Sequence, residues 1–118
     1  MGDATPIIRQ QIVGMDLSAV TFVRDYVQLD FDGPKFNVLT PITVASSSNC
    51  AISGGDPFRN RLCDQIGKVV SDVTYEEHKS FLIALADGTT ISFSLRKEDY
   101  PGPEAVEFFG SGGLWVVI

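Results

Sequence analysis

The sequence is poor in the residue types from which most catalytic and metal sites are built. It holds a single histidine, His78, and two cysteines, Cys50 and Cys63. Neither cysteine belongs to a Cys-x-x-Cys pair or stands beside the histidine, so the spacing gives no basis for a zinc or thiol-redox site. Phosphate-binding glycine loops, Gly-x-Ser-x-Gly elbows and EF-hand loops are also missing. We therefore assign no catalytic, metal or cofactor residue, and a non-catalytic role is favoured over an enzyme.

Long apolar runs and clusters of basic residues are missing as well. No apolar run approaches the roughly 18 residues needed to cross a bilayer, and the first residues, MGDATPIIRQQ, do not have the form of an export signal. The nine Lys and Arg residues are scattered, and the net charge is −6. We therefore expect a cytoplasmic protein with reduced cysteines that binds neither nucleic acid nor membrane.

The composition is that of a folded domain. The chain has 118 residues, of which 44% are hydrophobic and 20% charged. This length is typical of one domain, and this hydrophobic content is enough to bury a core. We expect residues 1–118 to form a single domain.

Two β-hairpins give the strongest local signals. Apolar and polar residues alternate over 27–31 and again over 36–38, on either side of an Asp-Gly-Pro turn. The same pattern recurs over 81–85 and 91–95, around Asp87-Gly88. Alternation with a period of two predicts strands, and the Asp-Gly turns predict hairpins. Pro41 predicts an interruption or a sheet edge if the strand continues toward residue 44.

The two hairpins look like copies of one unit. Gln11-Ile12 aligns with Gln65-Ile66, and Gly14 precedes a Val-Thr-Phe triplet much as Gly67 precedes Val-Thr-Tyr. The glycines lie 53 residues apart and the Asp-Gly turns 55 apart, so the second copy would contain a two-residue insertion. An internal repeat of 11–44 and 65–95 is therefore predicted, although small β units can also resemble each other by chance.

Short helices and a final strand are predicted elsewhere. Asp56, Pro57 and Gly67 favour a helix between them, with Phe58, Leu62 and Ile66 on its buried face. Pro103 and Gly110 bracket a second candidate helix. The polar stretches 45–49 and 53–55 predict a surface loop, and 114–118 predicts an apolar strand. The fold class expected is mainly β or α+β: about six to seven antiparallel strands in a curved sheet, partial barrel or sandwich, built from two related β-β-β units.

A few residues could carry chemistry, but each also has a simpler structural interpretation. His78 stands in a charged segment typical of a solvated turn. Cys63 lies beside the apolar face of the predicted helix, which favours packing or an idle thiol over nucleophilic chemistry. Asp30 and Asp32 could share one strand face, yet two carboxylates without further oxygen ligands do not make a calcium or magnesium site.

The segment 96–104 is charged and bracketed by prolines, which restrict the positions open to Tyr100. It could be a rigid connector or a recognition loop, and the former is favoured. Together with the preceding Asp-Gly hairpin and the Gly-Leu-Trp-Val-Val-Ile end, it resembles a stretch of small bacterial proteins of unknown role, over residues 62–118. The resemblance implies a bacterial domain and brings no catalytic motif.

Two classes of function remain open from the sequence. The first is a non-catalytic binding or interaction module, with a protein partner or a second copy of the chain bound near Tyr100 and Trp115, because aromatic residues concentrate in interfaces. The second is a small-ligand-binding protein or enzyme whose site is built from non-contiguous strand residues. If the two units are related by a twofold axis, the groove between them is where such a site should lie.

Overall fold

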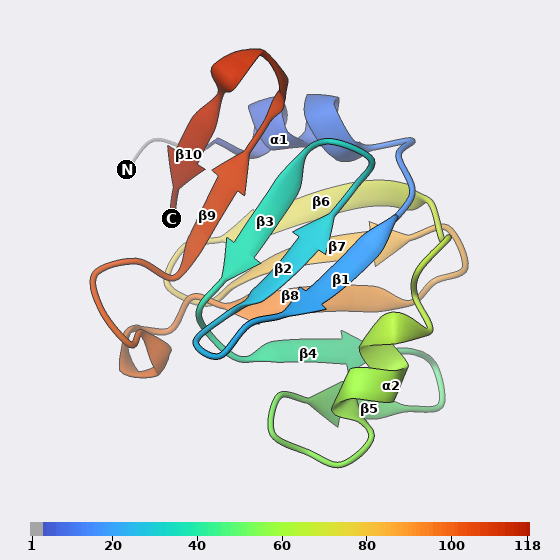
Figure 1. Cartoon of the computed structure of the whole chain (residues 1–118). Helices are drawn as coiled ribbons and strands as arrows, with labels where there is room; N and C mark the ends of the chain where they lie inside the picture. The colour runs from blue at the N-terminus through green and yellow to red at the C-terminus, as the bar shows by residue number, and fades with distance from the viewer. Residues whose placement is uncertain (1–3) are drawn as a thin grey trace.

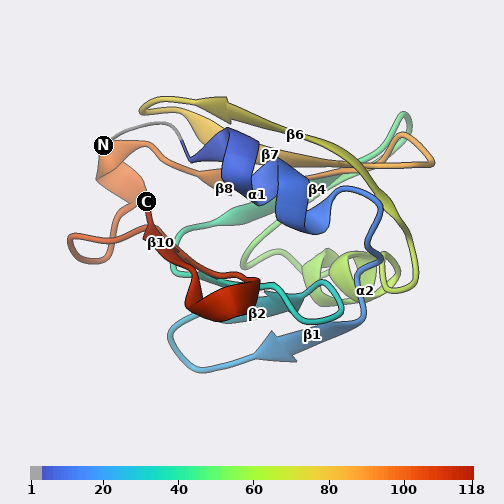
Figure 2. The same cartoon turned by 90° about the horizontal axis from the view of Figure 1, so that it is seen from above.

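The protein folds into two antiparallel β-sheets of five strands each that pack face to face (Figures 1 and 2). The structure, a computed structural model, describes residues 4–118. The first sheet has the order β1-β2-β3-β9-β10, formed by Ala19–Phe22, Val27–Asp30, Lys35–Val38, Val106–Phe109 and Trp115–Val117. The second has the order β5-β4-β8-β7-β6, formed by Cys50–Ile52, Ile42–Ala45, Thr90–Ser94, Ser80–Leu85 and Val70–Glu76.

Two short α-helices lie between the sheets (Figure 2), near opposite ends of the molecule as seen in Figure 1. Helix α1, Thr5–Ile12, packs against β6, and α2, Phe58–Cys63, packs against β4 and β5. Neither of these helices, the two in the described part of the chain, is long and apolar enough to span a membrane. Two 3-10 turns, η1 at Lys97–Asp99 and η2 at Ser111–Gly113, complete the described elements.

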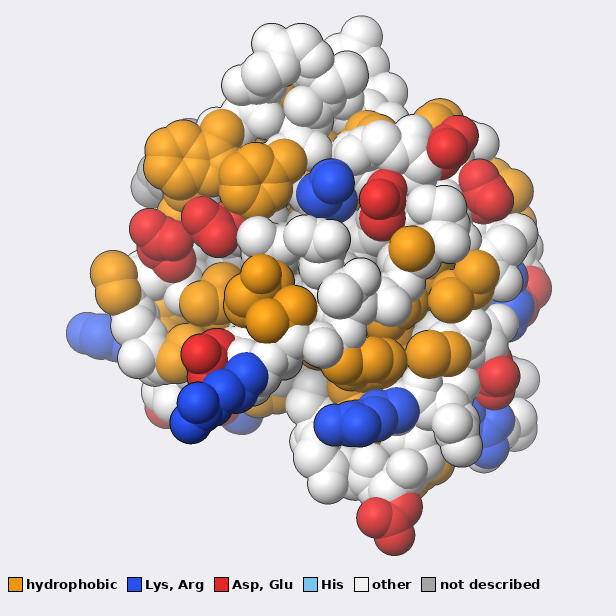
Figure 3. Space-filling model, viewed as in Figure 1, with side chains coloured by type: hydrophobic (Ala, Val, Ile, Leu, Met, Phe, Trp, Pro, Cys, Tyr) orange, Lys and Arg blue, Asp and Glu red, His pale blue; other side chains and the backbone are white. Residues whose placement is uncertain are grey.

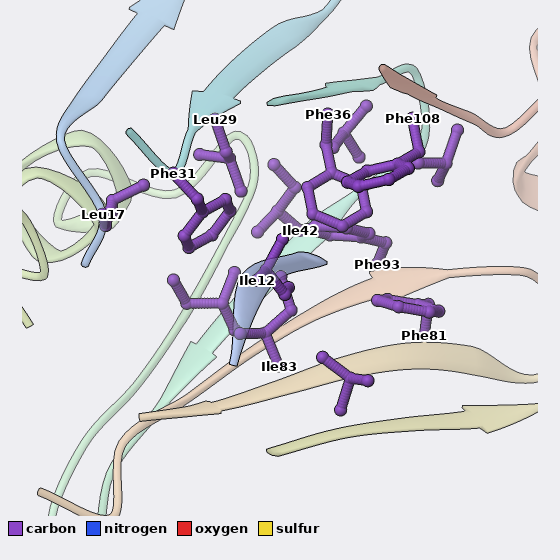
Figure 4. Packing of buried hydrophobic residues seen from close by; sticks show 14 of the residues in the cluster. Ile12, Leu17, Leu29, Phe31, Phe36, Ile42, Phe81, Ile83, Phe93 and Phe108 are labelled. Carbon is purple, nitrogen blue, oxygen red and sulfur yellow. The ribbon is translucent and has the colours of Figure 1, made fainter. Parts of the chain in front are cut away.

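The core lies between the sheets and is centred on Phe36 of β3 (Figure 4). Strand alternation places one face of each sheet inward, where the apolar residues are buried. The Phe36 ring lies 4.8 Å from that of Phe108 on its own sheet, and 5.4 and 5.7 Å from those of Phe93 and Phe81 on the other. The two sheets therefore share one hydrophobic cluster.

Both predicted hairpins are confirmed, as β2–β3 and β7–β8. The interruption expected at Pro41 is also present, because there the chain leaves β3 of the first sheet and enters β4 of the second. The fold is mainly β as expected, but it has ten strands in two open sheets instead of six or seven.

The strand pairing of the first half matches that of the second. The elements α1 and β1 to β5 correspond in order to α2 and β6 to β10, and exchanging them converts the strand order of one sheet into that of the other. Asn37 faces Glu107 where β3 pairs with β9, and the corresponding Ser92 faces Thr43 where β8 pairs with β4. The registers agree in each such pair of strands, with one extra residue in each of the β6–β7 and β7–β8 turns.

The segments that follow the two helices cross each other with the same symmetry. Gly14 N–H donates to Val70 at 2.9 Å, and the corresponding Gly67 N–H donates to Leu17 at 2.7 Å. Val70 N–H donates to Met15, and Leu17 N–H in turn donates to Lys68. This reciprocal pattern is what a twofold axis passing near Asp16 and Val69 produces. A common origin of the two halves by duplication stays a prediction.

Several local expectations were wrong. The helix predicted between Pro103 and Gly110 does not form, because this stretch becomes β9 and is paired on both sides by β3 and β10. Helix α2 ends at Cys63, so Ile66 is 44% exposed and does not join the core. The expected loop stretches 45–49 and 53–55 are separated by strand β5, which was not predicted, and helix α1 was not predicted either.

Candidate functional site

Strand β10 forms one edge of the first sheet and carries the most exposed large apolar side chain of the described residues, Trp115, which is 57% exposed. The expected final strand is thus confirmed. Leu114 accepts a hydrogen bond from Gly110, and Ile118 both donates to and accepts from Val106. Because backbone groups alternate along an antiparallel strand, the N–H and C=O groups of Trp115 and Val117 point away from β9. These groups can therefore pair with another strand.

The outer face of the first sheet is covered by no helix in the described chain, and Figure 3 views the molecule from this side. Trp115 lies directly opposite Phe109, followed across the sheet by Lys35 and Asp30. Val117 lies opposite Glu107, beside a row of polar side chains on which Gln28 donates to Asn37 at 2.9 Å. Among these outward-facing strand positions the aromatic side chains therefore lie on β9 and β10, and apolar side chains also reach the surface elsewhere on this side of the molecule (Figure 3).

Tyr100, the other aromatic residue expected at an interface, is partly buried against the core. It follows η1, where Ser94 donates a hydrogen bond to Asp99 and Arg96 lies 3.1 Å from the same carboxylate. The hydrogen bond from Ser94, followed by that from Arg96, lowers the pKa of Asp99 from its usual value. These contacts hold the start of the 96–104 segment as the chain passes from β8 to β9. Of the two residues predicted at an interface, Trp115 is well exposed and Tyr100 is not.

Two hollows lie where the halves meet, and they occupy corresponding places in the fold. The first hollow, of about 600 Å³, lies between α1, the β2–β3 turn and the β9–β10 turn, and is lined by Gln10, Gln11, Met15, Asp32, Pro34 and Ser111, among others. The second hollow, of about 390 Å³, lies between the end of α2, the β7–β8 turn and the β4–β5 turn, and its lining includes Ser46, Arg61, Gln65, Lys68, Asp87 and Thr89. Each hollow thus combines elements of both halves.

An internal ion pair organises the second hollow. The ammonium of Lys68 lies 2.7 Å from the Asp87 carboxylate and donates a hydrogen bond to the Gln65 side-chain oxygen at 2.8 Å. The pKa of Asp87 falls to about 2, first because of the hydrogen bond from Lys68 and then because of the one from the Thr89 N–H. The cation in this hollow is therefore the ammonium group of Lys68, a residue of the chain itself.

The first hollow is built from corresponding elements, although its turn backbone differs at Asp32, and its lining includes no cation. Gln11, Met15 and Asp32 take the places of Gln65, Lys68 and Asp87. The Gln11 side-chain oxygen accepts hydrogen bonds from the N–H and hydroxyl of Ser111, at 3.0 and 2.9 Å. Within residues 4–118, the Asp32 carboxylate makes no hydrogen bond or ion pair.

The residues singled out from the sequence for chemistry are not brought together. His78 is exposed in the β6–β7 turn, with φ of +61°. Its Nε2 atom lies 3.3 Å from the Oε1 atom of the neighbouring Glu77. Cys50 and Cys63 are both exposed free thiols, so of the two structural interpretations given for Cys63 the packing one was wrong. The described residues contain no group of three or more potential ligands that could hold a metal ion.

Asp30 and Asp32 are separated by the start of the β2–β3 turn. Asp30 ends β2, where its carboxylate accepts a hydrogen bond from the Gly33 N–H at 3.0 Å. Asp32 adopts φ of +57° in the turn itself and lines the first hollow. The two hollows were missed because their lining is not contiguous, although aligning the repeats pairs Met15 with Lys68 and would have drawn attention to that difference.

In comparisons with known proteins, the chain matches no protein-family model, no curated protein and no solved structure.

Proposed function

We propose that this protein is a non-catalytic interaction module that associates with a second copy of itself through the edge of β10. The observation that supports the proposal is the exposure of Trp115 on an edge strand whose outward backbone groups have no neighbouring strand in the described chain. Unpaired edges of this kind are natural templates for strand addition.

The partner proposed is a second copy because β10 is complementary to itself. Antiparallel pairing about Val116 sets Trp115 opposite Val117 of the second copy, and each of these residues can then both donate and accept a main-chain hydrogen bond. The Trp115 ring then lies between Phe109 of its own chain and Val117 of the other. The segment 114–118 has no charged side chain, so the pairing brings no like charges together.

The other three edge strands are better protected against pairing. Strand β6 carries Asp72 and Glu76 and has a register shift between Val70 and Asp72. Strand β5, which is as short as β10, contacts helix α2. Beside β1, the ring of Phe58 from α2 meets that of Phe22 edge-on at 6.4 Å. Charges, bulges, short strands and covering helices are the usual means of blocking an edge.

The experiment is a measurement of solution mass across a concentration series. A short strand pair buries less than a standard interface, so we expect a reversible dimer with a dissociation constant on the order of 10 μM to 1 mM. Val117→Pro removes an N–H that points away from β9, so it blocks the second ladder without costing a hydrogen bond inside the chain. Both Val117→Pro and Trp115→Ser are expected to be monomeric throughout.

Ile52→Ser is the matched control. Ile52 occupies the position in β5 that corresponds to Val117 in β10 and is 52% exposed, so a loss of dimer through general surface polarity would appear in this variant too. The control is expected to dimerise like the unmodified protein. A strict monomer at about 1 mM, or a dimer unaffected by Val117→Pro, would refute the proposal.

A further inference from the structure

Because the two hollows occupy corresponding places in the fold, the residues that line them can be compared position by position. In the second hollow a primary ammonium, that of Lys68, lies against the Asp87 carboxylate. In the first hollow the equivalent carboxylate, Asp32, is present, but the lysine is replaced by Met15. The place that Lys68 fills from within the chain is thus open in the first hollow.

The lining of the first hollow suits a cation and disfavours an anion. None of the residues that line it is basic, and Asp32 is the one acidic group among them. Met15 is half-buried, and it lines the same hollow as Asp32 together with the largely buried Pro34, so Met15 offers apolar surface in that hollow. A volume of about 600 Å³ falls in the range of small-ligand sites.

We propose that the first hollow binds a primary ammonium group carried on a short aliphatic chain, with the ammonium against Asp32 and the chain against Met15 and Pro34. The ligand's N–H groups donate to the carboxylate as the Lys68 ammonium donates to Asp87 in the second hollow. The site does not depend on self-association through β10. Both a free alkylamine and a lysine side chain of a peptide present this chemistry.

Binding is expected to be weak because the carboxylate is solvent-exposed. Exposed ion pairs contribute little free energy, and an alkyl chain of a few carbons adds a modest apolar gain. A dissociation constant on the order of 1 mM is therefore expected for butylammonium. Affinity of this size is measured by NMR titration of backbone amides, with sodium chloride at equal ionic strength as the reference.

The first test uses butylammonium and N-acetyl-lysine methylamide as probes of the two sources. We expect saturable shifts of the Gly33 and Ser111 amides with at least one probe, and the tighter probe identifies the source. Asp32→Asn should weaken binding by about tenfold or more, because it removes the charge while Asn tolerates the positive φ of this position. Asp25→Asn, outside both hollows, is the control and should leave the affinity unchanged.

The second test exchanges the residues that distinguish the hollows. Met15→Lys supplies a tethered ammonium and should abolish the titration while lowering the pKa of Asp32, as Lys68 does for Asp87. Lys68→Met should create a second binding site, seen as new saturable shifts at Gly88 and Thr89. Shifts that match those of sodium chloride, full binding by Asp32→Asn, or no new site in Lys68→Met would each overturn the proposal.

Discussion

Replacing Phe36 by alanine should destabilise the fold more than the same replacement at any exposed phenylalanine. Phe36 is fully buried, and its ring has four aromatic neighbours with centroids 4.8 to 5.8 Å away. A buried Phe→Ala change costs about 3–5 kcal/mol, and each aromatic pair contributes about 0.5–1.5 kcal/mol beyond burial. Because these neighbours come from both sheets, the cavity cannot close by moving one element. We therefore expect a loss of about 4–5 kcal/mol.

The assay is urea unfolding followed by far-UV circular dichroism, with the free energy of unfolding compared at equal denaturant slope. Phe22→Ala serves as the control, because Phe22 is 37% exposed and contacts Phe58 and Arg59 at the surface. The control should lose about 1–2 kcal/mol. A loss below about 2 kcal/mol for Phe36→Ala, or one no larger than that of the control, would show that the sheets do not share one core around this ring.

Three further predictions concern the symmetry of the fold. Gly14→Ala and Gly67→Ala should each cost about 1–2 kcal/mol in urea unfolding, and by similar amounts, because both glycines have φ near +90° while an added Cβ meets no atom within 4 Å. The lowered pKa of Asp87 stabilises the fold above its usual value of 3.8, and this contribution is lost as the pH falls toward 2; acid titration of Lys68→Met should show a smaller loss, because only the hydrogen bonds from Thr89 remain. Fragments cut between β5 and α2 should be unfolded separately and regain sheet circular dichroism when mixed, because β3 and β4 find partners in the other half.

The sequence alone predicted the elements that are specified locally. In both hairpins, alternation fixes the buried face and an Asp-Gly turn fixes the connection, so no distant contact is needed to recognise them. Strand β9 differs, because Pro103, Glu104 and Glu107 favour a helix start while Val106 and Phe108 gain burial only once β3 and β10 flank them. Pairing with distant strands decided the structure there.

Helix α1 was missed for a related reason. Its N-cap makes no side-chain hydrogen bond, and its eight residues are too few to be stable alone. Burial of Ile8 and Ile12 between the sheets, with an ion pair of 2.8 Å from Arg9 to Asp72 on β6, supplies what the local sequence does not. The same limit applied to the first hollow, whose walls come from three separate segments.

The exchange of strands between the halves makes the stability of the two sheets inseparable. Strand β9 of the second half fills the place beside β3, and β4 of the first half fills the corresponding place beside β8. Either half alone would hold the strands of only one three-stranded meander, whose apolar face would lack its covering sheet and whose inner edge would lack its partner, so it should not stay folded. Opening one sheet thus requires separating strands of the other half as well, so both halves should unfold in one cooperative transition.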